Sequence, residues 1–261
     1  MNNTLPLTNA KKEVARIIKF IQNTLQKQDA KNVILAASGG TDSTTCLYLL
    51  AQAMPGKNIF VIHLPYHKSV FAKLQQLATN LGIPKGNLFE ISIGTIVGTI
   101  ATMSDLVSRS DLNKVRLGNI IARTRMIVLY DLAKKQRALV CGTENKTEYY
   151  LGYFTRFGDE ASDFEPIRHL YKTQVYQLAK HLGLPQEIIT QSPTAGLWEG
   201  QTDEGEFGFS YAEADQVLYF YFDKKLSVKE IQKKGFRNAK KVIEWVKKKD
   251  YKHNTPYVID K

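Results

Sequence analysis

A short loop near the start of the chain has the composition of a phosphate-binding site. It reads SGGTDS over residues 38–43 and follows a bare apolar run at 32–37. The two glycines let backbone N–H groups turn toward one point, and the hydroxyls of Ser38, Thr41 and Ser43 add further donors. A helix that begins at this loop would add the positive potential of its N-terminal end. The loop is therefore suited to hold an anion.

Asp42 is the residue of this loop that a phosphate alone would not favour, because two negative groups repel each other. A divalent cation between them removes the repulsion, and Mg²⁺ typically takes one or two carboxylates together with phosphate oxygens. We therefore predict that Asp42 is a magnesium ligand. The alternative is that the glycines permit a tight turn and Asp42 caps the following helix. The lysine and second glycine of a Walker P-loop are absent, which argues against γ-phosphoryl transfer by that machinery.

The elements that must position the loop alternate between strand and helix. Apolar spacing predicts a helix over 7–28 with Thr8 or Asn9 as its N-cap, and further helices from the loop to about 54, over 69–81 and over 115–137. Short apolar runs predict strands over 32–37, 58–64, 87–91 and 138–141. This alternation predicts an α/β fold, a doubly wound parallel sheet with helices on both faces. Ligands of such sheets bind beyond the carboxyl ends of the strands, where the loop lies.

Beyond residue 143 the strand signals vanish and helical periodicity takes over. Helices are predicted near 173–182, 211–223, 227–234 and 238–249, after a stretch rich in glycine and acidic residues at 152–163. Residues 198–208 combine glycines, acidic residues and aromatics without a clear period, which fits a mobile loop over a site. No linker separates a second domain, so we expect residues 1–261 to form a single domain with a helical C-terminal part.

Composition narrows the choice of partners and compartment. Lys and Arg number 36 against 25 Asp and Glu, and the resulting charge of +11 predicts a polyanionic partner such as a nucleotide, a nucleic acid or a membrane surface. The chain shows no apolar leader and no apolar run that could span a membrane, which predicts a cytoplasmic protein. We interpret Cys46 and Cys141 as reduced, buried packing residues. The basic run from Lys233 to Lys249 is interpreted as a solvated helix face, with RNA binding as the alternative.

The SGGTDS loop resembles the signature of the ATP-pyrophosphatase families, which cleave ATP between the α- and β-phosphates. That signature fixes the half-reaction and not the substrate, since several synthetases and tRNA-modifying enzymes share it. Five later motifs resemble the NAD synthetase family specifically, and the resemblance spans roughly residues 11–256. The motifs are GNIIARTRM at 118–126, GTENKTE at 142–148, GYFTRFGD at 152–159 followed by Asp163 and Lys172, SPTA at 192–195, and QTDEGEFG at 201–208.

This resemblance implies a ligase that forms a C–N bond in the last step of NAD synthesis. ATP adenylates the nicotinate carboxylate of deamido-NAD, and ammonia then displaces AMP, which gives NAD, AMP and pyrophosphate. Magnesium is the implied cofactor, and no covalent nucleophile is expected. Because the synthetase resemblance accounts for the 261 residues, we expect no glutaminase domain and free ammonia as the nitrogen source. The resemblance also implies a homodimer with the substrate site at the subunit interface, and neither a nucleic acid nor a membrane as partner.

The resemblance also assigns residues to three sites. Asp42 and Glu148 are the implied magnesium ligands, and the spacing supports this, since both follow strand ends at one edge of the sheet. The implied ATP-binding residues are Ala36, Ala37, Ser38, Gly39, Gly40, Thr41, Asp42, Ser43, Thr143, Lys172 and Thr194. The implied deamido-NAD-binding residues are Arg123, Arg156, Asp163 and Lys252.

Some positions depart from the family pattern. Thr41 replaces a larger residue, Arg156 replaces a lysine, the stretch 251–256 carries over only Lys252, and residues 92–113 match no motif. Two other functions therefore stay open. A tRNA-modifying ATP-pyrophosphatase would share the loop and suit the positive charge, and a nucleotide sensor would keep the fold without turnover. Both carboxylates, Asp42 and Glu148, are retained, and a sensor has no need of them.

Overall fold

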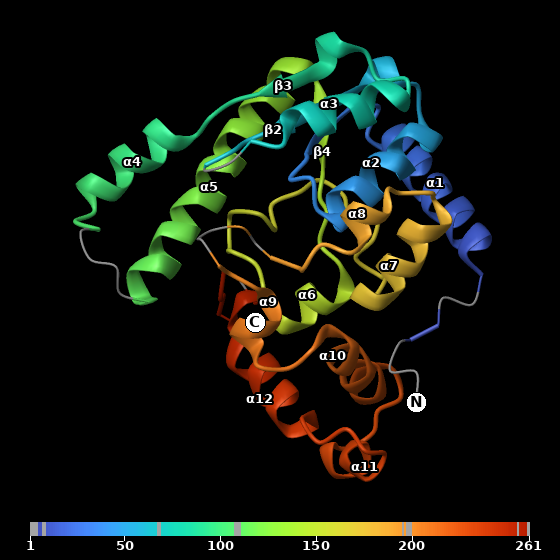
Figure 1. Cartoon of the computed structure of the whole chain (residues 1–261), viewed down its shortest axis with the longest axis vertical. Helices are drawn as coiled ribbons and strands as arrows, with labels where there is room; N and C mark the ends of the chain where they lie inside the picture. Colours follow the sequence, from blue (N-terminus) through green and yellow to red (C-terminus); the bar gives the residue numbers. More distant parts are fainter. Residues whose placement is uncertain are drawn as a thin grey trace.

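The core of the molecule is a parallel sheet, as the alternating pattern predicts. The computed structural model describes residues 5–6, 9–66, 69–106, 111–194, 196, 200–254 and 256–259. Within them the sheet has the strand order β3-β2-β1-β4, built from β1 (Asn32–Ala36), β2 (Ile59–His63), β3 (Leu88–Glu90) and β4 (Ala138–Cys141). Leu35 lies between Val61 on one side and Cys141 on the other, all in parallel register. The first strand is thus central, and its carboxyl end lies beside those of β2 and β4 (Figure 1).

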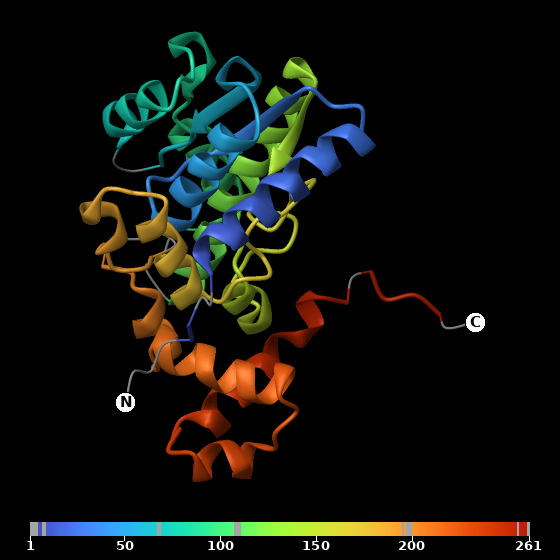
Figure 2. The ribbon, with the colours of Figure 1, turned by 90° about the vertical axis from the view of Figure 1, so that its right-hand side faces the viewer.

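Helices cover both faces of this sheet (Figures 1 and 2). Val33 and Leu35 pack in one core with α1 (Ala10–Lys27), α2 (Thr41–Ala53), α3 (Phe71–Asn80) and α7 (Lys172–His181). Ile34 packs in a second core with α4 (Gly94–Met103) and α5 (Asp111–Gln136). Successive strand residues face opposite sides, so a run buried on both faces is continuously apolar. Each fully buried Leu or Ile stabilises the fold by roughly 1.5–3 kcal/mol.

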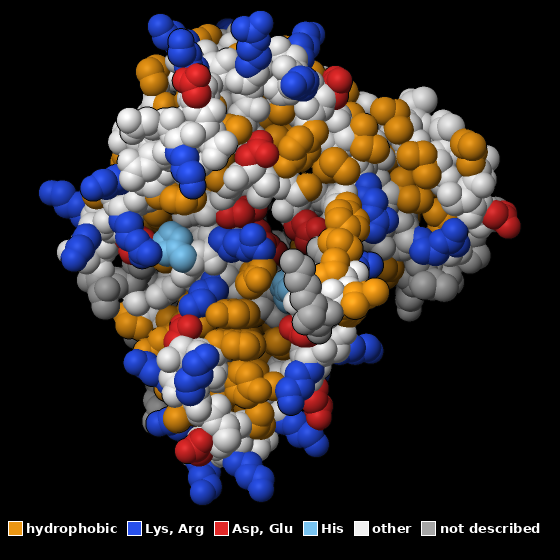
Figure 3. Space-filling view, turned by 180° about the vertical axis from the view of Figure 1, so that it is seen from behind, with side chains coloured by type: hydrophobic (Ala, Val, Ile, Leu, Met, Phe, Trp, Pro, Cys, Tyr) orange, Lys and Arg blue, Asp and Glu red, His pale blue; other side chains and the backbone are white. Residues whose placement is uncertain are grey.

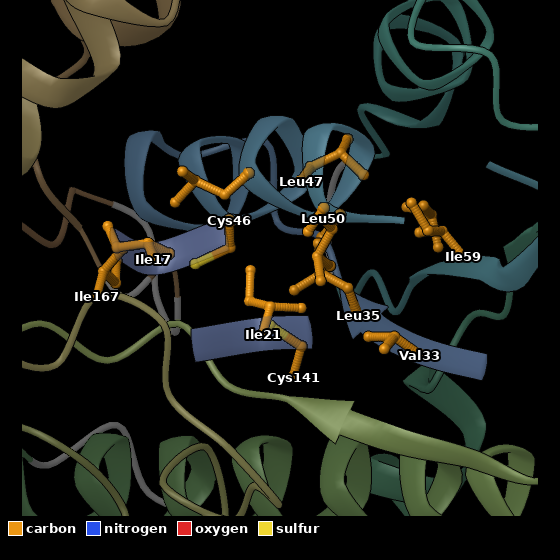
Figure 4. Packing of buried hydrophobic residues seen from close by; sticks show 14 of the residues in the cluster. Ile17, Ile21, Val33, Leu35, Cys46, Leu47, Leu50, Ile59, Cys141 and Ile167 are labelled. Carbon is orange, nitrogen blue, oxygen red and sulfur yellow. The ribbon is translucent and has the colours of Figure 1, made fainter. Parts of the chain in front are cut away.

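The helix α2 lies directly against the central strand. Leu47 and Leu50 belong to the same core as the buried residues of α1 and β1, which Figure 4 shows from close by. Cys46 and Cys141 are free and buried in the same core, which confirms their interpretation as packing residues. Because α2 is enclosed in this way, the loop at its N-terminal end is held at a fixed place beside the sheet edge.

The C-terminal part is helical and has its own apolar core. Phe207, Tyr211 and Val242 are buried there, and the helices form the lower half of the molecule in Figure 1. A π-helical turn at Tyr219–Asp223 extends α10. The remaining helices are α6 (Lys146–Leu151), α8 (Gln186–Ile189), α9 (Asp203–Phe207), α10 (Tyr211–Leu218), α11 (Val228–Lys233) and α12 (Ala239–Lys249), with single 3₁₀ turns at Gly56–Asn58, Lys85–Asn87 and Asp250–Lys252.

Most predicted elements are confirmed with ends shifted by a few residues, but two regions differ. The sequence did not predict α4, which occupies part of the unmatched stretch 92–113. The interpretation of 198–208 as a mobile loop is wrong for its second half. There α9 forms, and Phe207 is 1% exposed in the C-terminal core. Trp198 and Ala195 lie outside the described residues, as does Thr8, while Asn9 caps α1 by accepting a hydrogen bond from Lys12 N. In the described part of the chain, no helix is long and apolar enough to cross a membrane.

Candidate active site

The glycine loop lies where β1 ends and α2 begins. Gly39 has a φ of 85°, a left-handed conformation that favours glycine, and it turns the chain sharply at this point. Gly40 is the N-cap of α2 and offers no side chain to accept from the first-turn N–H groups of the helix. The hydroxyls of Ser38 and Ser43 lie 3.1 Å apart across the loop. Backbone donors and hydroxyls therefore converge beside a helix N-terminus, as anion binding requires.

Two carboxylates and one ammonium meet next to this loop. The Nζ of Lys172 donates to the carboxylate of Asp42 and lies 3.3 Å from Oε1 of Glu148. The lysine side chain is 5% exposed, so this cation is buried between its two partners. The structure thus brings together Asp42, Glu148 and Lys172, three residues that the sequence analysis assigned to magnesium or ATP.

Helix beginnings hold all three of these residues in place. Asp42 lies in the first turn of α2, Glu148 in the first turn of α6, and Lys172 is the first residue of α7. Asn145 caps α6 by accepting from the backbone N–H of Glu148, and Glu148 Oε2 accepts in return from the N–H of Asn145. Asn145 also donates through Nδ2 to Oδ1 of Asp42 over 3.1 Å. Three helix N-termini therefore point at one small volume, which is favourable for negative charge.

Asn145 lies in the GTENKTE motif, but the sequence predicted no role for it. The signal for it was present, because Asn followed three residues later by Glu is the pattern of a capping box. The structure contains that box. What the pattern does not encode is the contact of Asn145 with Asp42, since the two residues are 103 positions apart.

Burial dominates the electrostatics of the cluster. It raises the pKa of Glu148 to about 8, an effect that Asp42 reinforces and that Lys172 opposes. For Lys172 burial acts in the other direction, but the charges of Asp42 and Glu148 outweigh it and raise the pKa of the ammonium above its ordinary value. Lys172 therefore stays charged, and two acidic groups share one cation.

The carboxylate oxygens of this cluster are ligands of the kind that Mg²⁺ prefers. Within the described ranges, no group of three or more His, Cys, Asp or Glu side chains could hold a metal ion. Two carboxylates, Asp42 and Glu148, nevertheless contact the same buried cation. Mg²⁺ usually keeps several waters and takes one or two carboxylates plus phosphate oxygens. Asp42 and Glu148 thus supply two carboxylates of this set, and waters or phosphate oxygens would supply the other ligands.

Other residues assigned to ATP are spread along the same edge of the sheet. Ala36 ends β1, and Ala37 donates its N–H to Ile62 O at 2.9 Å, so both belong to the sheet. Thr143 is half-buried two residues after β4. Thr41 turns its hydroxyl away, donating to Ile188 O of α8 at 2.9 Å, which leaves its backbone N–H for a ligand. Thr194 is exposed, and its hydroxyl accepts from Gly196 N at 3.1 Å.

The residues assigned to deamido-NAD form a second group along the segment 152–163. Arg123 of α5 donates through Nε to the carbonyl of Arg156 at 3.1 Å. Lys252, just after α12, donates to the carbonyls of Gly152 and Phe154 at 2.7 and 2.5 Å. Burial lowers the pKa of this lysine to about 8. Arg123 of α5 and Lys252 of the turn after α12 therefore both contact this segment.

Asp163 lies beside β4, at the edge of a cavity. Its Oδ2 accepts from the N–H of Val140 at 2.7 Å, and its side chain lines a cavity of about 720 Å³. Arg16, Tyr149 and Arg168 also line this cavity, which therefore lies between α1, α6 and the segment 162–169 before α7. From behind, the surface is hollowed between the upper and lower halves of the molecule, and acidic, basic and apolar side chains meet there (Figure 3).

Comparison with known proteins assigns a family to this arrangement. The model of a family described as NAD synthase matches residues 13–256. An NH(3)-dependent NAD(+) synthetase of Thermococcus sibiricus is 39% identical over 249 residues, which cover 94% of this chain and 95% of the relative. Two solved structures are each 28% identical to this chain. An NH3-dependent NAD synthetase from Campylobacter jejuni has a TM-score of 0.77, and the match covers 97% of this chain and 100% of that one. An NMN synthetase from Francisella tularensis has a TM-score of 0.79, and the match covers 97% of this chain and 99% of that one.

Proposed function

We infer the reaction from the premise that this chain belongs to the NAD synthase family. The chain is a ligase that joins ammonia to deamido-NAD at the expense of ATP and releases NAD, AMP and pyrophosphate. The supporting observation is the meeting of Asp42, Glu148 and Lys172 beside a loop of backbone donors. A buried cation, two carboxylates and three helix N-termini suit a polyphosphate that carries its own metal ion.

The reaction proceeds in two displacements. A carboxylate oxygen of the nicotinate group attacks the α-phosphorus of ATP, the bond to the bridging oxygen of the β-phosphate breaks, and pyrophosphate leaves. Ammonia then attacks the carbonyl carbon of the acyl adenylate, the C–O bond to AMP breaks, and the nitrogen loses a proton. Adenylation is required because an unactivated carboxylate would have to expel oxide. The protein contributes chiefly by aligning two polyanions and by neutralising their mutual repulsion.

The roles of the ATP-side residues follow from their positions. The N–H groups at the start of α2 and the hydroxyls of Ser38 and Ser43 hold the pyrophosphate portion of ATP. Lys172 donates to a phosphate oxygen once nucleotide enters, and Thr143 and Thr194 contact the nucleotide from the sheet edge and from the segment before α9. Asp42 and Glu148 would hold Mg²⁺, which when bound screens the phosphate charges.

The second substrate is bound by the group along 152–163. The guanidinium of Arg123 lies against the backbone of Arg156, and that of Arg156 lies over the ring of Tyr251. Guanidinium groups pair well with phosphate or carboxylate. Asp163 at the cavity edge and Lys252 complete this set. The carbonyls that Lys252 now contacts belong to the same segment, so the lysine positions that segment as well as adding charge.

The assembly that we propose is a homodimer in the cytoplasm with the deamido-NAD site at its interface. Its support is a band of exposed apolar side chains on α4 and α5, where Ile96, Met103, Val115 and Ile127 are 46%, 84%, 51% and 60% exposed. These two helices project from the side of the body in Figure 1. Exposed apolar side chains gathered on neighbouring helices are typical of protein interfaces.

The purified chain tests this function directly. It is incubated with ATP, Mg²⁺ and deamido-NAD, with ammonium in one sample and glutamine in another, and NAD, AMP and pyrophosphate are measured. We expect equal amounts of all three products in the ammonium sample and no NAD with glutamine. Folded protein that binds ATP but makes no NAD would contradict the proposal.

A second candidate substrate is nicotinate mononucleotide, because one similar structure is an NMN synthetase. It carries the same nicotinate carboxylate and lacks the adenylyl half. A parallel sample with this substrate decides between the two. We expect kcat/KM to be at least about tenfold higher for deamido-NAD, because one good contact to its adenylyl half would contribute roughly that factor.

A further inference from the structure

A fully buried carboxylate from the C-terminal part connects the two helices that carry Glu148 and Lys172. Asp215 lies on α10 and is 0% exposed. Its Oδ1 accepts from the hydroxyl of Thr147 at 2.5 Å, and its Oδ2 accepts from the backbone N–H of Thr173 at 2.8 Å. Thr147 precedes Glu148 in the first turn of α6, and Thr173 follows Lys172 in the first turn of α7. One side chain thus contacts both helix beginnings.

A third hydrogen bond closes this arrangement into a ring. The hydroxyl of Thr147 accepts from the backbone N–H of Lys172 at 2.9 Å while it donates to Asp215. Because the first N–H groups of a helix have no partner inside the helix, these bonds fix where α7 starts relative to α6. The side chains of Glu148 and Lys172 extend from these same first turns and meet at 3.3 Å.

We propose that Asp215 is a positioning residue for the ATP and magnesium site, since it sets the spacing between Glu148 and Lys172 through Thr147 and Thr173. It touches neither substrate. The inference rests on the proposed roles of Glu148 and Lys172, and it adds a requirement from α10, an element that carries none of the assigned site residues.

The chemistry of the ring makes the carboxylate hard to replace. Both groups that face Asp215 are donors, an O–H and an N–H, so the site needs an acceptor on each side. An asparagine presents one oxygen and one NH₂ group, and therefore one of the two donors loses its acceptor. A buried donor without an acceptor is costly, so the two helix beginnings separate or rotate to find other partners.

The test compares Asp215→Asn with a matched carboxylate on the same helix. Glu213 also lies on α10, but its carboxylate accepts from the N–H and Nδ2 of Asn238 at 3.1 and 2.7 Å, next to α12. The dissociation constant of Mg·ATP is measured by calorimetry well below the melting temperature, together with the Mg²⁺ concentration that gives half the maximal rate. We expect both to rise about tenfold in Asp215→Asn, the effect of roughly one lost buried hydrogen bond. We expect less than a twofold change in Glu213→Gln, even where its melting temperature falls as much.

Thr147 supplies a second comparison that holds even if Asp215→Asn does not fold. Thr147→Val removes the bridging hydroxyl, and Thr147→Ser keeps it, so the first loses Mg·ATP affinity about tenfold and the second recovers most of it. Wild-type Mg·ATP affinity in Thr147→Val, or in folded Asp215→Asn, overturns the inference. Absence of NAD from the wild-type chain contradicts only the proposed function, because Mg·ATP binding is measured without amidation.

Discussion

The ammonium of Lys172 is bonded to the carboxylate of Asp42, although the two residues lie 130 positions apart in the chain. The same ammonium also contacts Glu148. A cation belonging to the protein therefore lies between the two carboxylates that we propose for magnesium. In the proposed function, Asp42 and Glu148 would hold Mg²⁺ when Mg·ATP binds, and Lys172 would instead donate to a phosphate oxygen. Neither the two acids nor the lysine is left buried without an opposite charge at either stage, which would be strongly unfavourable.

Asp42→Asn is the most direct test of the carboxylate pair. The amide keeps the shape and can still accept from Asn145, but it has no charge for a metal ion or for Lys172. We expect kcat/KM to fall at least about 100-fold, equivalent to roughly 2.7 kcal/mol, with a circular dichroism spectrum like that of the wild type. Asp29→Asn, at an exposed position with a φ of 48°, is the control and keeps full activity. An active Asp42→Asn enzyme would show that the magnesium assignment is wrong.

Lys172→Met tests whether the ammonium of Lys172 and a metal ion compete for the same two carboxylates. The test needs no nucleotide. Removing the ammonium leaves Asp42 and Glu148 together without their cation, so the variant is less stable in metal-free buffer. It also frees the carboxylates for a metal ion. We expect added Mg²⁺, without ATP, to raise the melting temperature of the variant by several degrees and that of the wild type by about a degree or less. Equal shifts in the two proteins would mean that the ammonium and the metal do not share a place.

Glu144→Gln tests a buried carboxyl near the end of β4. Burial raises the pKa of Glu144 to about 9, against 4.5 for an ordinary glutamate, although Arg168 Nε lies 3.2 Å from it. The unfolded chain therefore releases this proton at lower pH than the folded one, and stability falls as the pH rises from about 4.5 to 9. Glutamine removes this dependence. The melting temperature of Glu144→Gln minus that of the wild type should therefore increase by several degrees as the pH rises from about 5 to 9. Each kcal/mol of unfolding free energy corresponds to about 2–4 °C.

The exposed Glu90 at the end of β3 provides the matched control for this titration. Glu90→Gln should follow the wild-type melting temperature across the same pH range. A parallel course for Glu144→Gln and the wild type would exclude Glu144 as the source of the pH dependence.

Lys252→Met tests the second substrate group. Lys252 joins the turn after α12 to the carbonyls of Gly152 and Phe154, and methionine keeps the apolar stem while losing these bonds. We expect KM for deamido-NAD to rise about tenfold, as the loss of one charged hydrogen bond implies, while KM for ATP stays within about twofold. Lys247→Met, on the exposed side of α12, is the control. An equal rise in both KM values would instead indicate a general loosening of the C-terminal part.

Ile127→Glu tests the proposed dimer. This side chain is 60% exposed on α5 in the single chain, and a charge there is costly only if a partner covers it. We expect sedimentation to give a dimer for the wild type and a monomer for the variant, with an unchanged circular dichroism spectrum. A dimeric variant would require a different interface.

Sequence periodicity predicted the sheet and most helices because burial leaves a clear apolar pattern in the sequence. A strand buried on both faces is continuously apolar, and a helix buried on one face has apolar residues at regular spacing. Val33 to Leu35 form an uninterrupted apolar run, and α1 buries Val14, Ile17, Ile21 and Leu25 at regular spacing. The helix α4 gave no such signal. It contains Gly and Thr, which are weak helix formers, and buries only Val97 within its length. Its place is set by packing against α5, a tertiary effect that a local pattern does not contain.

For the site, the sequence predicted the residue types and the edge of the sheet, while the pairings came from the fold. A glycine loop after β1 and a Glu shortly after β4 are local signals. The contact of Lys172 with Asp42 depends on α7 packing beside α2, and that of Asp215 with Thr147 on α10 packing beside α6. The assignment of Thr41 illustrates the same limit, because only the fold reveals that its hydroxyl binds α8.

The position of β1 in the middle of the sheet has a consequence for synthesis of the chain. β1 pairs with β2 soon after it emerges from the ribosome, but its other edge waits for β4, which begins at Ala138. Until then a strand whose Val33, Ile34 and Leu35 are fully buried in the finished protein keeps one row of backbone groups unpaired. Such an edge is a template for association with other chains. A nascent chain that stalls before β4 therefore keeps this edge open to other chains.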